Sequence, residues 1–231
     1  MSIFVMVDKP LLCFTANTAN SSIGLCCTGT AQVTFESSTD GTTWNSYTIN
    51  TAITLSNIWD KVFFRNTSDT DTGLSTNSMY YYFDMSWSIA ASWDISYLLN
   101  KNWTKTIWNW CFNRLFYQRT SLTSTPSFYA TTMGNYCCND MFALCSNLTT
   151  LPKLPATSLW EWCYNTMFAR CTNIKLSSTQ TWEYQTEYRI PTSWTGTDWG
   201  WATGSMFYAT WWTFTWTPSI NTTYYTSNTL V

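Results

Sequence analysis

The sequence predicts an α+β protein in which an N-terminal antiparallel β-sandwich precedes a solenoid of short repeats. Before residue 85, apolar and polar residues alternate in several short segments, as they do in half-buried strands. From residue 107 on, the same residue types recur at a 26-residue step. A fixed period of this length is typical of a solenoid, in which each unit buries its apolar face only against its neighbours.

Residues 1–85 carry the pattern of a small sandwich. Residues 33–37 alternate between apolar and polar side chains, and Asp40-Gly41 then predicts a hairpin turn into a return strand at 44–49. Further short strands are expected at 53–55, 61–65 and 80–85. Short strands separated by turn signals at this spacing are typical of an antiparallel sandwich.

Residues 86–106 are expected to form a connector. Its apolar segment, residues 95–99, is expected to cap the first repeat, because the terminal unit of a solenoid must cover an otherwise bare core.

Cysteine and phenylalanine mark the repeat. The 26-residue step is kept by Cys111, Cys137 and Cys163, and by Phe116, Phe142 and Phe168. We expect the phenylalanines to form a ladder in the core. Ile107, Cys111 and Leu115 are spaced by four, which predicts one face of a short helix. A short extended segment follows in each unit, and one helix plus one strand per repeat is typical of a leucine-rich repeat.

The register changes in the last repeat. Met206-Phe207 repeats Met167-Phe168 after a 39-residue step, which is half as long again as the regular one. We therefore predict that the leucine-rich-repeat solenoid spans residues 107–220, with an insertion near 178–204 that holds a hairpin around 183–189. Residues 221–231 are expected to form a C-terminal strand or strap.

Composition excludes several classes of function. The net charge is −2 and only 10% of residues are charged, without the basic stripe that nucleic-acid binding needs. The sequence contains no run of 18 apolar residues, so it predicts no segment that inserts into a membrane. The N-terminus lacks the basic segment and the long apolar segment of a secretory signal. We therefore expect either that the protein stays inside the cell until lysis or that a signal has been removed from this sequence.

Enzymatic activity is not expected. The chain contains no histidine, which excludes serine–histidine, cysteine–histidine and histidine–metal chemistry. Its nine cysteines lack zinc-finger spacing, and those that follow the repeat are expected to be reduced core residues. We predict no catalytic residue, no metal ligand and no cofactor.

Residues 163–174 contain the pattern Cys-Tyr-x-x-Met-Phe-x-x-Cys-x-x-Ile, and residues 135–157 contain a close variant. These repeats resemble the BspA-like leucine-rich repeat of gut bacteria and their phages, and the N-terminal part is similar to the β module that often precedes it. Arg119 departs from the pattern, because it stands where the later repeats have Cys145 and Cys171. Such proteins include bacterial surface adhesins and phage structural proteins.

The resemblance implies a non-enzymatic virion structural protein, either a capsid-decorating head fibre or a tail-associated receptor-binding fibre, assembled in the host cytoplasm. Its expected partners are other capsid or tail proteins and a host-surface glycan or protein, and a homotrimer is expected by analogy. The alternatives are a bacterial cell-surface adhesin and a carbohydrate-binding module.

Tryptophan is unusually abundant, with 16 residues against 8 glycines. One hypothesis is a binding surface near the C-terminus, formed by Trp199, Trp201, Trp211, Trp212 and Trp216. The other is that some tryptophans reflect a recoded codon. Gly134 has Trp108 and Trp160 as its repeat equivalents, and Trp87, Trp93 and Trp194 stand where similar chains usually carry glycine. Tryptophan does not replace glycine easily where φ is positive.

Overall fold

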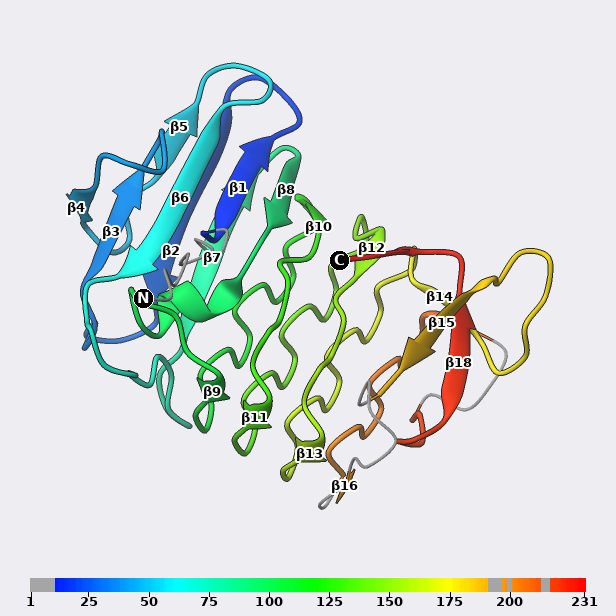
Figure 1. Cartoon of the computed structure of the whole chain (residues 1–231). Coiled ribbons are helices and arrows are strands. Elements are labelled where there is room, and N and C mark those ends of the chain that lie inside the picture. The colour runs from blue at the N-terminus through cyan, green and yellow to red at the C-terminus, as the bar shows by residue number, and fades with distance from the viewer. Residues whose placement is uncertain (1–10, 191–196, 199–200, 213–216) are drawn as a thin grey trace, which may run out of the picture.

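The computed structural model describes residues 11–190, 197–198, 201–212 and 217–231 (Figure 1). The described chain is all-β, with several small sheets, and it contains no α-helix; the one helical element in it is the 3₁₀ turn Ile95–Leu98. The predicted α+β class is therefore wrong.

The N-terminal part consists of two sheets whose side chains meet in an aromatic core. Their strand pairs are antiparallel except for one, the parallel pair of residues 122–124 with residues 89–92. One sheet has the order β10-β8-β1-β6-β3-β4 and the other the order β5-β2-β7. Their strands are β1 (Cys13–Ala16), β2 (Ser21–Cys27), β3 (Phe35–Ser38), β4 (Asn45–Tyr47), β5 (Ile53–Leu55), β6 (Lys61–Asn66), β7 (Tyr81–Ser86), β8 (Ile89–Ser92) and β10 (Leu122–Ser124). Between the sheets, the ring of Phe83 lies 4.6 Å from that of Phe14 and 5.4 Å from that of Phe64, centroid to centroid.

The hairpin predicted at Asp40-Gly41 is confirmed. Strands β3 and β4 pair antiparallel, with Phe35 opposite Tyr47. Gly41 has a φ of +75°, which an L side chain adopts only with strain. The carboxylate of Asp40 accepts the backbone N–H groups of Thr43 and Thr42, and these bonds hold the pKa of Asp40 well below its usual range.

The described residues between 107 and 210 form stacked coils that continue directly from this sandwich. One corner of each coil is a short parallel strand, and these align in the order β16-β13-β11-β9. The strands are β9 (Thr106–Ile107), β11 (Thr132–Met133), β13 (Ser158–Leu159) and β16 (Thr197–Asp198). In Figure 1 they lie side by side below the coils.

The predicted phenylalanine ladder is confirmed. The rings of Phe116, Phe142 and Phe168 are fully buried and stack at centroid distances of 5.3 and 5.4 Å. Phe83 of β7 extends the ladder at one end at 5.3 Å, and Phe207 extends it at the other at 5.4 Å. The sandwich and the coils therefore share one continuous core, and the longer last step places Phe207 on the same stack.

The helix predicted in each repeat is wrong, because the backbone hydrogen bonds run between coils. Between residues 110 and 118 of the first coil, even-numbered N–H groups donate to a carbonyl of the next coil, as from Phe112 to Cys137 and from Phe116 to Met141. Odd-numbered N–H groups donate three positions back, as from Leu115 to Phe112. A helix would instead bond every N–H four positions back within the same segment. Successive residues thus alternate: one N–H closes a turn within the coil, and the following N–H bonds to the next coil.

A left-handed residue at every fourth position produces the spacing that suggested a helix. Positive φ recurs in each coil at four-residue intervals, at Trp110, Arg114 and Gln118; Tyr136, Asp140 and Leu144; Trp162, Thr166 and Arg170; and Trp201, Ser205 and Ala209. Each such residue reverses the direction of the chain after a turn. The intervening apolar residues, such as Cys111 and Leu115, point inward as predicted and are fully buried.

The C-terminal tail folds back along the stack. Strand β18 (Thr223–Thr226) pairs antiparallel with both β14 (Lys175–Ser177) and β15 (Thr186–Arg189), and β19 (Thr229–Leu230) pairs parallel with β12 (Thr150–Leu151). The remaining strand, β17 (Trp211–Trp212), pairs parallel with β14. The segment around 183–189 thus contributes a strand that pairs with the tail, where a local hairpin was predicted.

Asn228 fastens this tail to two coils. Its side-chain oxygen accepts the N–H of Lys175 at 2.7 Å, and its amide donates to the carbonyls of Thr149 at 2.9 Å and Asn173 at 3.0 Å. The tail is therefore a strap, as the sequence predicted.

Removing one ring of the ladder tests its contribution to stability. Phe142→Ala is expected to lower the free energy of unfolding by about 3–5 kcal/mol, because it leaves a cavity between two stacked rings. Trp182→Ala, at a side chain that is 88% exposed, is the matched control and is expected to change it by about 0.5 kcal/mol or less. Urea unfolding measures both, and equal effects would contradict a ladder that supports the fold.

Candidate binding surface

The predicted tryptophan surface is only partly described. Trp199 and Trp216 lie outside the described residues, as does the side chain of Trp212. Trp201 and Trp211 are 70% and 67% exposed. Trp201 begins the last coil, and Trp211 lies in β17 at its end, so these two belong to different corners of the coil.

Trp201 belongs to a surface ladder of rings that sequence reasoning missed. Trp110, Tyr136 and Trp162 occupy the equivalent position in the earlier coils, and successive ring centroids lie 4.1, 6.0 and 6.3 Å apart. The rings are nearly parallel, with interplanar angles of 4° to 18°. The available signal was the same repeat step, which the prediction applied to core residues and not to surface ones.

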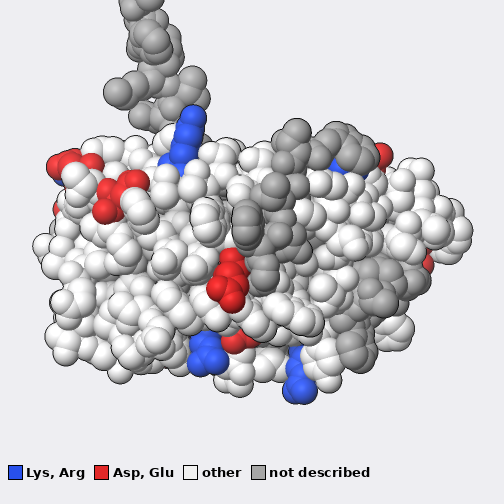
Figure 2. Space-filling model, turned by 90° about the horizontal axis from the view of Figure 1, so that it is seen from below, with Lys and Arg blue, Asp and Glu red and all other residues white. Residues whose placement is uncertain are grey.

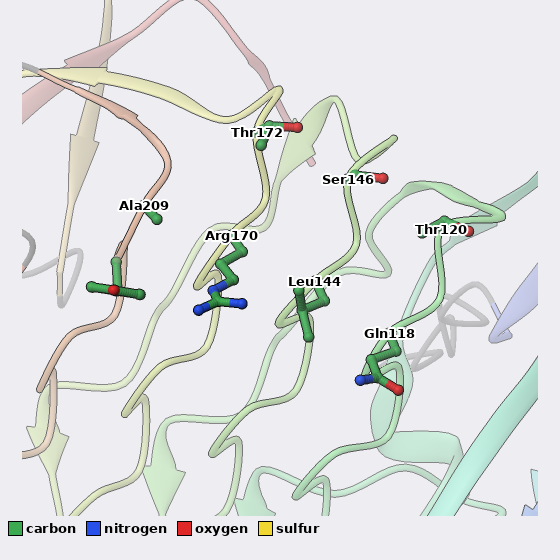
Figure 3. A pocket seen from close by; sticks show the side chains of 8 residues that line it. Gln118, Thr120, Leu144, Ser146, Arg170, Thr172 and Ala209 are labelled. Atoms are coloured by element: carbon green, nitrogen blue, oxygen red, sulfur yellow. The ribbon is translucent and has the colours of Figure 1, made fainter.

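A groove of about 660 Å³ crosses the coils on another side (Figure 3). It is lined by two rows of repeat-equivalent residues and by two residues of the last coil: Gln118, Leu144 and Arg170; Thr120, Ser146 and Thr172; and Tyr208 and Ala209. Figure 3 shows the two rows stepping from one coil to the next, with a hydroxyl on each of three successive coils. The sequence contains this row of hydroxyls at the repeat step, but nothing in it shows that the row borders a hollow.

Most of the polar groups that line the groove are uncharged. Its lining contains one cation, Arg170, and no acid. Arg170 is exposed, and its guanidinium carbon lies 5.8 Å from the ring centroid of Tyr208. Hydroxyl groups both donate and accept hydrogen bonds, whereas the guanidinium only donates. The groove therefore offers neutral hydrogen-bonding groups at the spacing of the coils, together with one site that favours an anionic group.

Charged side chains elsewhere are few and scattered. On the face shown in Figure 2, acidic and basic residues lie singly or in small groups among uncharged ones. In the described part of the chain, no group of three or more cysteine or acidic residues could hold a metal ion. Over the same residues, no helix has the length and apolar character needed to cross a bilayer.

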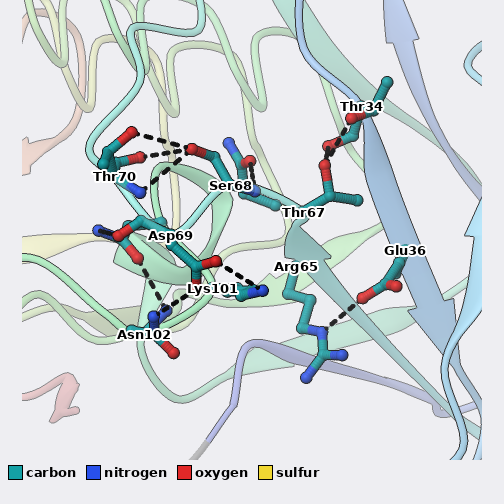
Figure 4. Close-up of polar contacts among 11 residues, drawn as sticks. Thr34, Glu36, Arg65, Thr67, Ser68, Asp69, Thr70, Lys101 and Asn102 are labelled. Carbon is teal, nitrogen blue, oxygen red and sulfur yellow. Dashed lines mark hydrogen bonds and ion pairs between the residues drawn. The ribbon is translucent and has the colours of Figure 1, made fainter.

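The densest polar cluster serves the fold (Figure 4). The carboxylate of Asp69 contacts the ammonium group of Lys101 at 3.0 Å and accepts the side-chain amide of Asn102 at 2.7 Å. The Lys101 contact, followed by the Asn102 hydrogen bond, lowers the pKa of Asp69. Arg65 and Glu36 pair at 2.8 Å across β6 and β3. The contacts of Asp69 join the loop after β6 to the segment after the 3₁₀ turn, and the Arg65–Glu36 pair joins two neighbouring strands.

The cysteines are core residues. None of the nine is in a disulfide bond, and all except Cys26 are buried. The thiols of Cys145 and Cys171 donate to the carbonyls of Phe116 and Phe142 in the preceding coil, each at 3.0 Å. Arg119 takes this position in the first coil, where it pairs instead with Asp84 of β7 at 2.9 Å. The departure from the repeat pattern thus occurs where the coils meet the sandwich.

No protein-family model, curated protein or solved structure matches this chain. The functional argument therefore depends on the architecture and on the surfaces described above.

Thiol labelling tests the burial of the cysteines. At neutral pH we expect one thiol, Cys26, to react rapidly with a disulfide reagent, and the other eight to react only on unfolding, because the reagent has no access to a buried thiol. Cys26→Ser should abolish the rapid phase and leave the slow one unchanged. Rapid reaction of several thiols in that variant would contradict the packing.

The same thiols make stability depend on alkaline pH. Burial raises the pKa of Cys111 from 9.0 to about 11 and that of Cys145 to about 12. The unfolded chain therefore loses these protons first, so the stabilisation is complete below pH 9 and declines as the pH rises toward 11. Urea midpoints between pH 8 and 10.5 measure the decline, which Cys145→Ala should make shallower. An unchanged slope would show that Cys145 does not contribute.

Proposed function

We propose that this chain is a non-enzymatic structural protein of a bacteriophage virion, either a capsid-decorating head fibre or a tail-associated receptor-binding fibre. The observation that carries the proposal is the stack of coils built onto a small sandwich through one core. Such a stack repeats each surface residue along a line and so presents an extended surface to a partner. The absence of histidine from the sequence agrees with a binding role.

We further propose that the coils are a BspA-like leucine-rich-repeat solenoid in which a run of turns replaces the helix. The support is the 26-residue step, the parallel strand at one corner of each coil, and the buried Cys, Met and Phe side chains at matching positions. Bonding between coils supplies the hydrogen bonds that a helix would have made internally.

The sandwich is the part suited to assembly. Strands β4 and β5 each lie at the edge of a sheet, and an edge strand offers backbone groups to another chain. The coils extend away from these edges in Figure 1. This arrangement supports a division in which the sandwich contacts other virion proteins or other copies of the chain, and the coils face the host.

A carbohydrate ligand is the second candidate, and the groove favours it. Hydroxyl groups at Thr120, Ser146 and Thr172 recur once per coil, and the coils are spaced by 5.3–5.4 Å at the phenylalanine ladder. An extended sugar chain that follows the stack would meet equivalent groups at each step. Arg170 would then select a sugar that carries a carboxylate or another anionic group.

Particle labelling tests the virion assignment. Antibodies raised against this chain are expected to decorate intact particles at the capsid or the tail in electron micrographs. Labelling of the surface of uninfected bacteria instead would support the adhesin alternative and overturn the virion proposal.

Adsorption competition tests the groove. The purified chain is expected to inhibit phage adsorption to host cells, and Arg170→Gln is expected to weaken that inhibition by at least about tenfold, which corresponds to the loss of about 1.4 kcal/mol of binding free energy. Lys61→Gln, at an exposed cation on the sandwich, is the matched control and should inhibit like the unchanged chain. Equal inhibition by Arg170→Gln would place the receptor site elsewhere, and a glycan array would then show whether any sugar binds.

Light scattering coupled to size-exclusion chromatography tests the proposed homotrimer. The expected mass is three times the 26.7 kDa of one chain. A monomer at micromolar concentration would contradict trimerisation through the sandwich.

A further inference from the structure

Seven tryptophans lie in the left-handed region of backbone conformation. Their φ angles range from +58° to +74°. They are Trp59, Trp87, Trp93, Trp103, Trp110, Trp162 and Trp201. A bulky L residue rarely adopts this conformation, because its Cβ approaches the neighbouring carbonyl oxygen. In most proteins a position of this kind is filled by glycine, or by asparagine or aspartate.

The usual preference is inverted in this chain. Among the described residues, only one glycine, Gly41, has a positive φ, against seven tryptophans. Gly134 has a different requirement, because a Cβ there would lie 2.5 Å from the backbone nitrogen of Asn109 in the preceding coil. Its repeat equivalents Trp108 and Trp160 are not among the positive-φ residues. The tryptophans with a glycine-like backbone conformation are therefore not Trp108 and Trp160, which the comparison with Gly134 along the repeat suggested.

The turns at Trp59 and Trp103 have hydrogen bonds typical of a glycine turn. Around Trp59, the N–H of Asn57 donates to the carboxylate of Asp60, and the N–H of Asp60 donates to the backbone carbonyl of Asn57. Trp103 donates its N–H to the carbonyl of Asn100 and then takes a φ of +74°. In tight connections of this type the left-handed position is the one where glycine is preferred.

Packing does not compensate for the strain at the most exposed positions. The side chains of Trp59 and Trp87 are 72% and 71% exposed. A buried indole could offset an unfavourable backbone conformation through the apolar area it removes from water, but an exposed one gains little. Strained conformations persist where the surrounding structure fixes them, and here the strands on either side fix the turn.

We propose that positions 59, 87, 93 and 103 are glycine positions, and that the protein made in its natural host carries glycine there. The codon UGA differs by one base from a glycine codon, and translation systems that reassign it read it as tryptophan or as glycine. If UGA encodes these positions, decoding it as glycine relieves the strain at all four. At positions 93 and 103 it also removes an indole that lies 6.2 Å from the ring of Phe63 and an indole that packs against the core. Positions 110, 162 and 201 share the backbone conformation, but Tyr136 shows that an aromatic residue is accommodated at this step of the repeat.

This assignment bears on the binding surface. If these positions carry glycine, the exposed indoles at positions 59 and 87 are absent from the surface of the sandwich. The groove, none of whose lining residues is tryptophan, is unaffected.

Peptide mass spectrometry of the protein from its natural source is the direct test. Peptides that span residues 59, 87, 93 and 103 are expected to have the mass of glycine at these positions. Tryptophan at all four positions would overturn the proposal.

Stability measurements give an independent test on the purified chain. Trp59→Gly and Trp87→Gly are each expected to raise the melting temperature by about 2–4 °C, because glycine adopts the left-handed conformation without the Cβ clash. Trp59→Ala and Trp87→Ala remove the same indole but keep the Cβ, so their gain should be smaller than that of glycine at the same site. Trp182→Gly, at an exposed tryptophan outside the positive-φ set, is the matched control and should not raise the melting temperature.

The test is the comparison of the melting temperatures of the glycine and alanine variants at the same position. A glycine variant that melts higher than its alanine counterpart supports the assignment. A glycine variant that melts below its alanine counterpart at both sites, as expected of an ordinary position, would contradict it.

Discussion

The backbone hydrogen bond between successive coils is the interaction on which the rest of the repeat region depends. Along the run of turns in each of the first three coils, every second N–H donates to a carbonyl of the next coil, as from Phe142 to Met167 and from Phe168 to Met206. The bonds in between close turns within the coil. Together they pair the backbone groups of a segment that has no helix, and buried backbone groups must be paired. This pattern holds the phenylalanine rings at one height and spaces the coils evenly.

The same constraint shapes the outer surface. A chain that alternates turns and inter-coil bonds needs a left-handed residue at every fourth position, and these positions point away from the core. Two outer surfaces of the stack begin at such positions: the ring ladder at Trp110 and Tyr136, and the groove at Gln118 and Leu144. The coil geometry therefore both strains the backbone and aligns the residues that could contact a partner.

Both ends of the stack are covered by parts of the chain with a different structure. At the N-terminal end, β7 donates the N–H of Phe83 to the carbonyl of Leu115, so the sandwich acts as the first layer of the stack. At the other end, Tyr188 of β15, a strand paired with the tail, packs against Phe207 with 6.4 Å between the ring centroids, and Asn228 of the tail bonds to the second and third coils. A stack of repeats exposes its apolar core unless its ends are covered, which explains why a sandwich and a strap accompany so few coils.

Sequence by itself determined the repeat step, the inward-facing cysteines and phenylalanines, the change of register before Phe207 and the hairpin at Gly41. Each of these depends on residue type and on spacing along the chain. Only the tertiary structure decided the conformation of each repeat, since a four-residue spacing of apolar residues such as Cys111 and Leu115 suits a helix and a run of left-handed turns equally well. The turns form because carbonyl groups of the next coil accept hydrogen bonds from N–H groups that would bond within the segment in a helix. The groove was likewise beyond the sequence, because a hollow between Thr120, Ser146 and Thr172 exists only once the coils are stacked.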